Sequence, residues 1–99
     1  TEGYICFDDL GLELIFSGLN PLEKAEFLSK TLSALDENER QLLTAYFEND
    51  MSLSETSRQL FIHKNTLQYK LNHIFRKSGL NPRAFRDAVM LYLGLNLAK

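Results

Sequence analysis

Side chains able to hold a nucleic acid are concentrated between positions 58 and 77 of this 99-residue sequence. The amide and phenol groups there match the donor and acceptor patterns that base edges present in the major groove. The predicted base-reading residues are Asn65, Gln68, Tyr69 and Asn72. Cationic and hydroxyl groups lie beside them, and such groups bind phosphates without reading sequence. The phosphate contacts predicted from residue type are Arg58, Lys64, Thr66, Lys70, Arg76 and Lys77.

Charge is divided unevenly along the chain, although the formal net charge is only −2. Residues 1–50 carry three basic and eleven acidic side chains, whereas residues 51–99 carry eight basic and two acidic ones. From Thr56 to Arg86 there are seven basic residues and no acidic one. The total charge indicates neither nucleic-acid nor membrane binding, but the local excess favours a nucleic-acid face over an ordinary solvated surface. The acidic half should repel DNA and leave one face attractive.

Two closely spaced helices are expected to position these side chains. Ser52 with Glu55 predicts the start of a short helix that ends near Leu60. A second helix is expected from about Lys64 to Lys77, after a connection of only three residues. Two helices in this arrangement, the second of them basic, form a helix-turn-helix at about 53–77, in which the second helix enters the DNA major groove.

A helical projection separates a buried side of the second helix from its polar side. At about 100° per residue, four apolar side chains fall within about 80° of the first of them and mark the side expected to be buried. They are Leu67, Leu71, Ile74 and Phe75. Tyr69 lies about 200° from Leu67 and is expected to be exposed. A small core that fixes the angle between the two helices is predicted from Ser57, Leu60, Ile62, Leu67 and Leu71.

Capping signals predict further helices before this pair, giving an all-α bundle of about six helices. The earlier helices are expected at 8–17, about 21–32 and about 37–49, the second of them begun by Asn20 and Pro21. Residues 4–7 suggest a short strand.

The last helix is expected to start at Asn81 and Pro82 and to be apolar on most sides from Ala88 to Leu97. Two arrangements fit such a helix. Either it crosses the centre of the bundle, or a stripe among its apolar residues meets another subunit or an upstream region of the parent protein. The residues of that stripe are Met90, Leu93 and Leu97.

The string "LSETSRQLFIHKNTLQYKLNHI", from Leu53 to Ile74, resembles the C-terminal DNA-binding domain of bacterial transcription regulators of the PucR and CdaR type, which control sugar-diacid and purine catabolism genes. The residues that match the family signature in order are Thr56, Leu60, Phe61, His63, Asn65, Thr66, Leu67, Tyr69 and Leu71. The flanking sequences also fit, so the resemblance covers at least residues 32–95. It implies a structural or phosphate-binding role for His63, which we expect to pack or hydrogen-bond at the turn. Gln68 stands where the family often has Arg, and because Arg reads guanine whereas Gln suits adenine, the preferred operator is expected to differ.

Together these features predict a helix-turn-helix domain of the Fis-like type without a wing, formed by residues 19–99 and preceded by a junction and first helix at 1–18. Its expected partners are double-stranded DNA, the upstream sensory region of a parent regulator and a second copy of the chain in a homodimer. The single Cys6 cannot form an internal disulfide and no segment reaches membrane-spanning length, so a cytoplasmic location is expected. The main alternative is a helical protein-interaction or dimerisation module that uses the apolar last helix.

The residue patterns do not indicate an enzyme or a metal site. His63 and His73 are ten residues apart without further ligand-type residues nearby, unlike a zinc site. The acidic residues Asp8, Asp9 and Glu13 stand at an expected helix start, where carboxylates normally complement the helix dipole. No nucleophile elbow, phosphate loop or metalloprotease motif is present. We therefore expect no catalytic residues and no cofactor.

Overall fold

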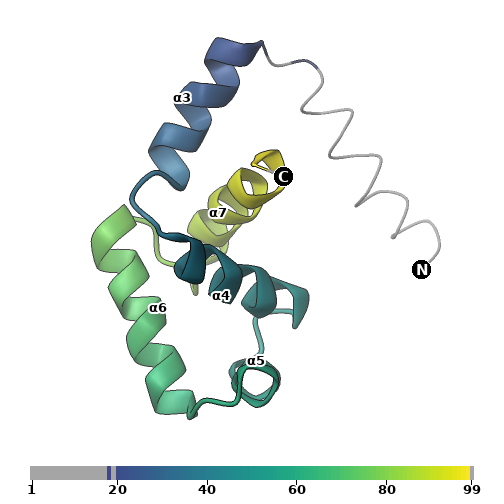
Figure 1. Ribbon diagram of the computed structural model, residues 1–99, viewed down its shortest axis with the longest axis vertical. Coiled ribbons are helices and arrows are strands. Elements are labelled where there is room, and N and C mark those ends of the chain that lie inside the picture. Colours follow the sequence, from purple (N-terminus) through teal and green to yellow (C-terminus); the bar gives the residue numbers. More distant parts are fainter. Residues whose placement is uncertain (1–17, 19, 99) are drawn as a thin grey trace, which may run out of the picture.

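The computed structural model describes residue 18 and residues 20–98, and these residues form an all-helical fold (Figure 1). The helices are α3 (Pro21–Thr31), α4 (Glu37–Glu48), α5 (Leu53–Leu60), α6 (Lys64–Ser78) and α7 (Phe85–Leu97). The described residues thus contain five helices rather than the six that were expected. The first expected helix, at 8–17, and the short strand at 4–7 lie outside the described residues.

Side-chain caps begin three of the helices where the sequence predicted. At α3, Asn20 Oδ1 accepts a hydrogen bond from the N–H of Glu23 at 2.8 Å, and the Glu23 carboxylate accepts one from the N–H of Asn20 at 2.9 Å. Asp36 and Glu39 form the same reciprocal pair at α4, with the same two distances. Ser52 Oγ caps α5 by accepting an N–H at 3.1 Å. These bonds satisfy N–H groups that a helix start leaves without an internal partner, so the local sequence decides where each helix begins.

The last helix begins later than predicted, at Phe85 rather than at Asn81 and Pro82. The Asn81 side chain accepts a hydrogen bond from the N–H of Arg83 at 3.1 Å, and the Asn81 carbonyl oxygen accepts one from the N–H of Ala84 at 3.0 Å. An Asn side chain that bonds the backbone two residues ahead closes a turn instead of capping a helix. The predicted start of this helix was wrong, because a helix cap and an Asn turn are formed by the same residue types.

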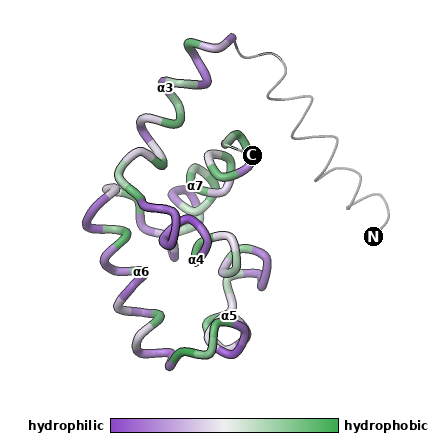
Figure 2. Tube along the Cα trace, viewed as in Figure 1, coloured by the Kyte–Doolittle hydropathy of each residue, from purple (hydrophilic) through white to green (hydrophobic). Residues whose placement is uncertain are grey.

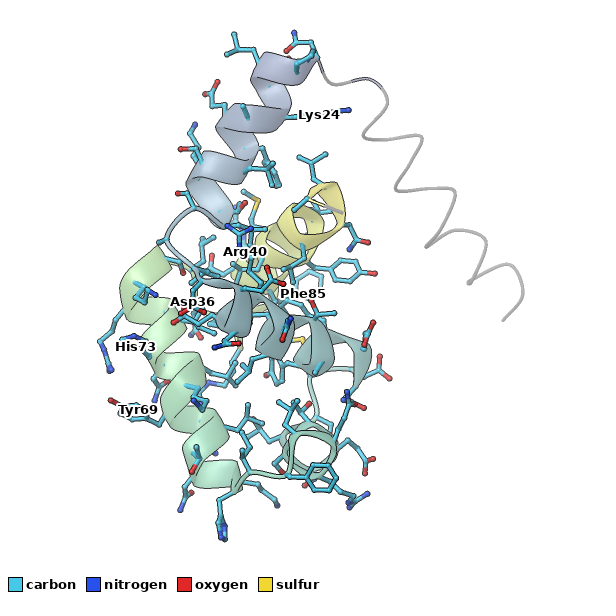
Figure 3. All side chains as sticks on the ribbon, viewed as in Figure 1. Lys24, Asp36, Arg40, Tyr69, His73 and Phe85 are labelled. Atoms are coloured by element: carbon cyan, nitrogen blue, oxygen red, sulfur yellow. The ribbon has the colours of Figure 1, made fainter. Side chains whose placement is uncertain are left out.

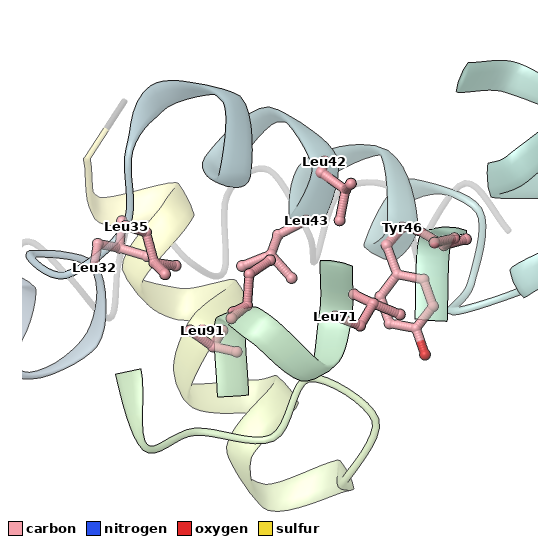
Figure 4. Close-up of a cluster of buried hydrophobic side chains, with 9 residues drawn as sticks. Leu32, Leu35, Leu42, Leu43, Tyr46, Leu71 and Leu91 are labelled. Atoms are coloured by element: carbon pink, nitrogen blue, oxygen red, sulfur yellow. The ribbon is translucent and has the colours of Figure 1, made fainter. Parts of the chain in front are cut away.

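One cluster of buried side chains joins α4, α6, α7 and the link before α4. Its members are Leu32, Leu35, Leu42, Leu43, Tyr46, Leu67, Leu71, Ile74 and Leu91. Figure 2 shows hydrophobic and hydrophilic residues recurring in turn along α6, the pattern of an amphipathic helix. Figure 4 shows how the cluster members of α6 meet those of α4. Burial of each such Leu contributes about 1.5–3 kcal/mol, and it fixes which side of α6 faces outward.

α7 packs against α3 and α4 through one of its sides. Its buried residues are Ala88, Leu91 and Gly94. At Gly94 the helices approach so closely that a Cβ atom would lie 2.6 Å from the Thr31 Oγ1 of α3. The other side of α7 stays open to solvent, and Phe85 is 78% exposed there.

Candidate nucleic-acid interface

α5 and α6 form a helix-turn-helix (Figure 1), and backbone hydrogen bonds hold its turn. The N–H of Ile62 donates to the carbonyl oxygen of Ser57 at 3.0 Å, and the N–H of Phe61 donates to that of Arg58 at 3.3 Å. This pair of bonds is a Schellman motif, which ends a helix through one residue of left-handed conformation. The motif redirects the chain from α5 into α6 within three residues.

The small core predicted between α5 and α6 is present. Three of its five members are buried, namely Ser57, Leu67 and Leu71. Leu60 and Ile62 are half-buried and pack against the main core. Thr56 is also fully buried, which an apolar pattern could not indicate because its side chain is polar. The position of α6 relative to α5 is therefore set by side chains on the side away from the polar face.

Phe61 occupies the left-handed position of the turn, and we expect Phe61→Gly to stabilise the fold. Its φ of 58° and ψ of 42° disfavour any residue with a Cβ atom, and its ring is 94% exposed and gains little from packing. Glycine adopts this conformation freely but loses more entropy on folding, which leaves a net gain of about 0.5–1 kcal/mol. Urea unfolding followed by circular dichroism measures it. Phe61→Ala keeps the Cβ atom and is the control, so equal stability of the two variants would contradict backbone strain at this position.

The side of α6 opposite the core is open to solvent, as the projection predicted. Tyr69 is 65% exposed, and Figure 3 shows its side chain projecting away from the bundle. Asn65 is exposed, whereas Gln68 and Asn72 are half-buried. All four predicted base-reading side chains therefore reach the surface of the molecule.

Two side chains near this face lie differently from the prediction. Phe75 was assigned to the buried side of α6 but is 42% exposed, because it lies about 80° from the centre of that side and meets only its rim. His63 precedes α6 and was expected to pack or hydrogen-bond at the turn. It is exposed, and its side chain makes no capping hydrogen bond in the structure.

Three of the predicted phosphate contacts have free cationic groups. Lys64, Lys70 and Arg76 are exposed, and none of them has an ion-pair partner within residues 18 and 20–98. Thr66 is exposed one turn before Lys70. Cations that form no ion pair are available to an incoming phosphate.

Two other predicted phosphate contacts already pair with carboxylates. Arg58 Nη1 lies 2.9 Å from Glu55 Oε1 of the same helix, and Lys77 Nζ lies 2.7 Å from Glu39 Oε1 of α4. His73 Nε2 faces the same Glu39 carboxylate at 3.9 Å. The basic run has no acidic residue of its own, but the fold supplies acidic partners from outside it. A phosphate at Arg58 or Lys77 competes with one of these carboxylates for the positive charge.

A residue of the turn before α7 also contacts the polar face, and the sequence pattern did not assign it to the site. Arg83 Nη2 donates a hydrogen bond to Asn72 Oδ1 at 2.7 Å. Burial raises the pKa of the Tyr46 hydroxyl, and the charge of Arg83 opposes this rise to a smaller extent. The guanidinium therefore lies against α6. No helical period links positions 72 and 83, since they belong to different elements.

The described residues form no metal site and no membrane-spanning helix. Among them, no three His, Cys, Asp or Glu side chains lie close enough together to hold a metal ion. No helix in this part of the chain is long and apolar enough to cross a membrane. Cys6 and the acidic cluster between 8 and 13 lie outside the described residues.

Comparison with known proteins identifies a family for this arrangement. The chain is 36% identical over 96 residues to the carbohydrate diacid regulator of Escherichia coli K12, and 34% identical over 87 residues to the proline-responsive transcriptional activator PutR of Bacillus subtilis 168. These alignments cover 92% and 78% of this chain but only 25% and 21% of the two relatives, so the chain spans about a quarter of their length. No solved structure matches it. The family model of the PucR C-terminal helix-turn-helix domain matches residues 40–97, which include all of α5, α6 and α7. The chain therefore belongs to the PucR C-terminal helix-turn-helix family.

Proposed function

We propose that this chain is the sequence-specific DNA-binding domain of a bacterial transcription regulator, with α6 as the helix that enters the major groove. The observation that carries the proposal is the open polar face of α6, which bears three unpaired cations and is held against α5 by a buried core. Helix-turn-helix proteins bind DNA by inserting such a helix while the preceding helix crosses the backbone. The family match and the regulators among the relatives support the same function.

The side chains of this face divide into two groups in the proposal. Those with amide and phenol groups approach base edges, and they are Asn65, Gln68, Tyr69 and Asn72. Those that hold phosphates are Lys64, Thr66, Lys70 and Arg76, with Arg58, His63 and Lys77 as further contacts. The exposed N–H groups at the start of α6 add a positive dipole end to the same surface.

A binding titration at two salt concentrations tests the proposal. Mixed-sequence duplex DNA is added to the chain at about 50 and about 200 mM salt, and binding is followed by fluorescence anisotropy. We expect the affinity to fall steeply at the higher salt, because each occupied phosphate releases bound counterions. A protein-interaction module with an incidental basic face would show no such binding, and that result would exclude the proposal.

Gln68→Ala is expected to cost about 1–3 kcal/mol of binding free energy at the preferred site and to relax selectivity at one base pair. Gln68 is half-buried on the polar side of α6, where its amide can bond adenine through both its oxygen and its nitrogen. A binding-site selection from randomised duplexes, carried out with the wild-type chain and the variant, measures the change. Lys24→Ala, on α3, is the control and should leave the selected sequence as it was. An unchanged preference in the Gln68 variant would remove this residue from the reading face.

We also propose that the parent protein acts as a dimer, because helix-turn-helix modules gain affinity by pairing on half-sites about one helical turn apart. The open side of α7 offers an apolar surface for such pairing. Phe85 is 78% exposed, and Val89 and Met90 are each 37% exposed. Leu93 and Leu97 of the predicted stripe are half-buried. Sedimentation of the chain alone and with duplex DNA distinguishes a dimer formed by this surface from a monomer.

The remaining parts of the proposal concern the parent protein. The unit formed by residues 19–99 is proposed to work in the cytoplasm, where the DNA is, and to be controlled by a sensory region of the parent. Two relatives are named as a carbohydrate diacid regulator and a proline-responsive activator, and the aligned segments cover only 25% and 21% of them.

A further inference from the structure

The turn between α6 and α7 is built to hold Arg83 in one place. Asn81 Oδ1 accepts the N–H of Arg83 at 3.1 Å, and the N–H of Asn81 donates to Asp87 Oδ2 at 2.9 Å. Pro82, which lies between Asn81 and Arg83 in the sequence, is fully buried. Each bond satisfies a polar group of the turn, and the buried proline fixes its backbone against the core. The backbone of Arg83 is thus anchored at the start of α7 while its side chain extends to α6.

The bond between Arg83 and Asn72 fixes which way the Asn72 amide faces. A guanidinium has only donors, so the atom 2.7 Å from Arg83 Nη2 must be the carbonyl oxygen of the amide and cannot be its nitrogen. With Oδ1 turned to Arg83, the NH₂ group is directed to the other side. Asn72 lies about 140° from the centre of the buried side, among the predicted base-reading residues. The NH₂ donor is therefore the group of Asn72 for which the described residues supply no partner.

We propose that Arg83 is a positioning residue for base recognition, which holds the Asn72 amide so that its NH₂ group meets base edges bearing acceptors. This inference rests on the proposed function of α6. Guanine presents two acceptors, O6 and N7, in the major groove, whereas adenine presents an acceptor and a donor side by side. An Asn free to use both its oxygen and its nitrogen suits adenine. An Asn whose oxygen is held by Arg83 therefore selects guanine over adenine at the position it reads.

The test is a binding-site selection from randomised duplexes with the wild-type chain, Arg83→Ala and Asn72→Ala. We expect guanine to be preferred over adenine about tenfold at one position by the wild type, which corresponds to about 1.4 kcal/mol. Arg83→Ala should abolish this preference and admit adenine at that position. Asn72→Ala should relax the same position, and the double variant should show no further loss, because the two residues act through one contact.

Asn72→Asp keeps the oxygen that accepts the Arg83 bond and removes the donor. We expect it to fold like the wild type and to select cytosine, whose N4 group is a donor, in place of guanine. This variant tests the inference even where loss of the Arg83 side chain weakens the fold. Arg86→Ala removes an exposed arginine three residues along the chain and is the matched control for loss of charge.

The outcomes separate this inference from the proposed function. Absence of duplex binding by the wild type overturns the proposed function, and the inference falls with it. Wild-type binding with base preferences unchanged in Arg83→Ala overturns the inference alone. A salt dependence reduced by about one unit of log–log slope in Arg83→Ala, without a change in preference, would identify a phosphate contact in place of a positioning residue. Equal changes in base preference for Arg83→Ala and Arg86→Ala would also overturn the inference.

Discussion

Leu71→Ala is expected to lower the free energy of unfolding by about 2–5 kcal/mol. Leu71 is fully buried, and Figure 4 places it beside Tyr46 of α4 in the core cluster. Truncation to Ala removes the buried carbons and leaves a cavity between α4 and α6 that the neighbouring side chains fill only in part. Small folds of this length are stable by about 5–15 kcal/mol, so the loss is a large fraction of the total. Urea unfolding followed by circular dichroism measures it.

Two further leucine variants separate cavity formation from a general effect of substitution. Leu71→Met keeps the side-chain volume and should cost less than about 1.5 kcal/mol. Leu22→Ala, on α3, truncates a leucine that is 76% exposed and should change stability by no more than about 0.5 kcal/mol. If the Leu71→Ala and Leu22→Ala chains unfold at the same urea concentration, Leu71 does not carry the packing between α4 and α6.

The helix-turn-helix was predictable because short-range rules decide its parts. Leu67 and Leu71 are four residues apart, so helical geometry alone puts them on one side of α6 and the polar groups on the other. The starts of α3, α4 and α5 follow from capping side chains within three residues of the helix. Such signals do not depend on the rest of the fold. The start of α7 shows their limit, because Asn81 closes a turn with residue types that equally well predict a cap.

The electrostatic details of the site were not predictable because they depend on contacts between distant parts of the chain. Lys77 pairs with Glu39, 38 residues earlier in the sequence, and Arg83 bonds Asn72 across the turn before α7. Neither pair has a period or a spacing that marks it. The sequence therefore indicates which face of α6 is polar. Only the packing of α4 and α7 shows which polar side chains of that face already have an ion-pair or hydrogen-bond partner.

The apolar pattern of α7 was ambiguous for a similar reason. A helix with apolar side chains on most sides fits both a bundle centre and an interface, since periodicity does not show what covers each side. The structure covers Ala88, Leu91 and Gly94 and leaves Phe85 exposed. α3 covers this face of α7 because Gly94 has no side chain there. A larger residue at position 94 would collide with Thr31.

Removal of the three unpaired cations of α6 is expected to give the largest change in DNA binding. In the variant Lys64→Ala, Lys70→Ala, Arg76→Ala, three counterion-releasing contacts are lost, and each contributes about 0.9 to the log–log slope of affinity against salt. The slope should fall by about 2.7, so a fourfold rise in salt should weaken the wild type about 40-fold more than the variant. Fluorescence anisotropy with one duplex at about 50, 100 and 200 mM salt measures both slopes.

The control removes cations from another part of the surface. Lys24 and Lys30 belong to α3, which Figure 1 places at the opposite end of the molecule from the turn between α5 and α6. Their replacement by Ala also lowers the net charge, yet it should leave the slope within about 0.5 of the wild-type value, because neither side chain reaches the phosphates in the proposed complex. If total charge governed binding, both the α3 and the α6 variants would lose slope. If local contacts govern it, only the α6 variant loses slope. Equal losses of slope in the α3 and α6 variants would show that DNA responds to total charge, and α6 would then have no special place in binding.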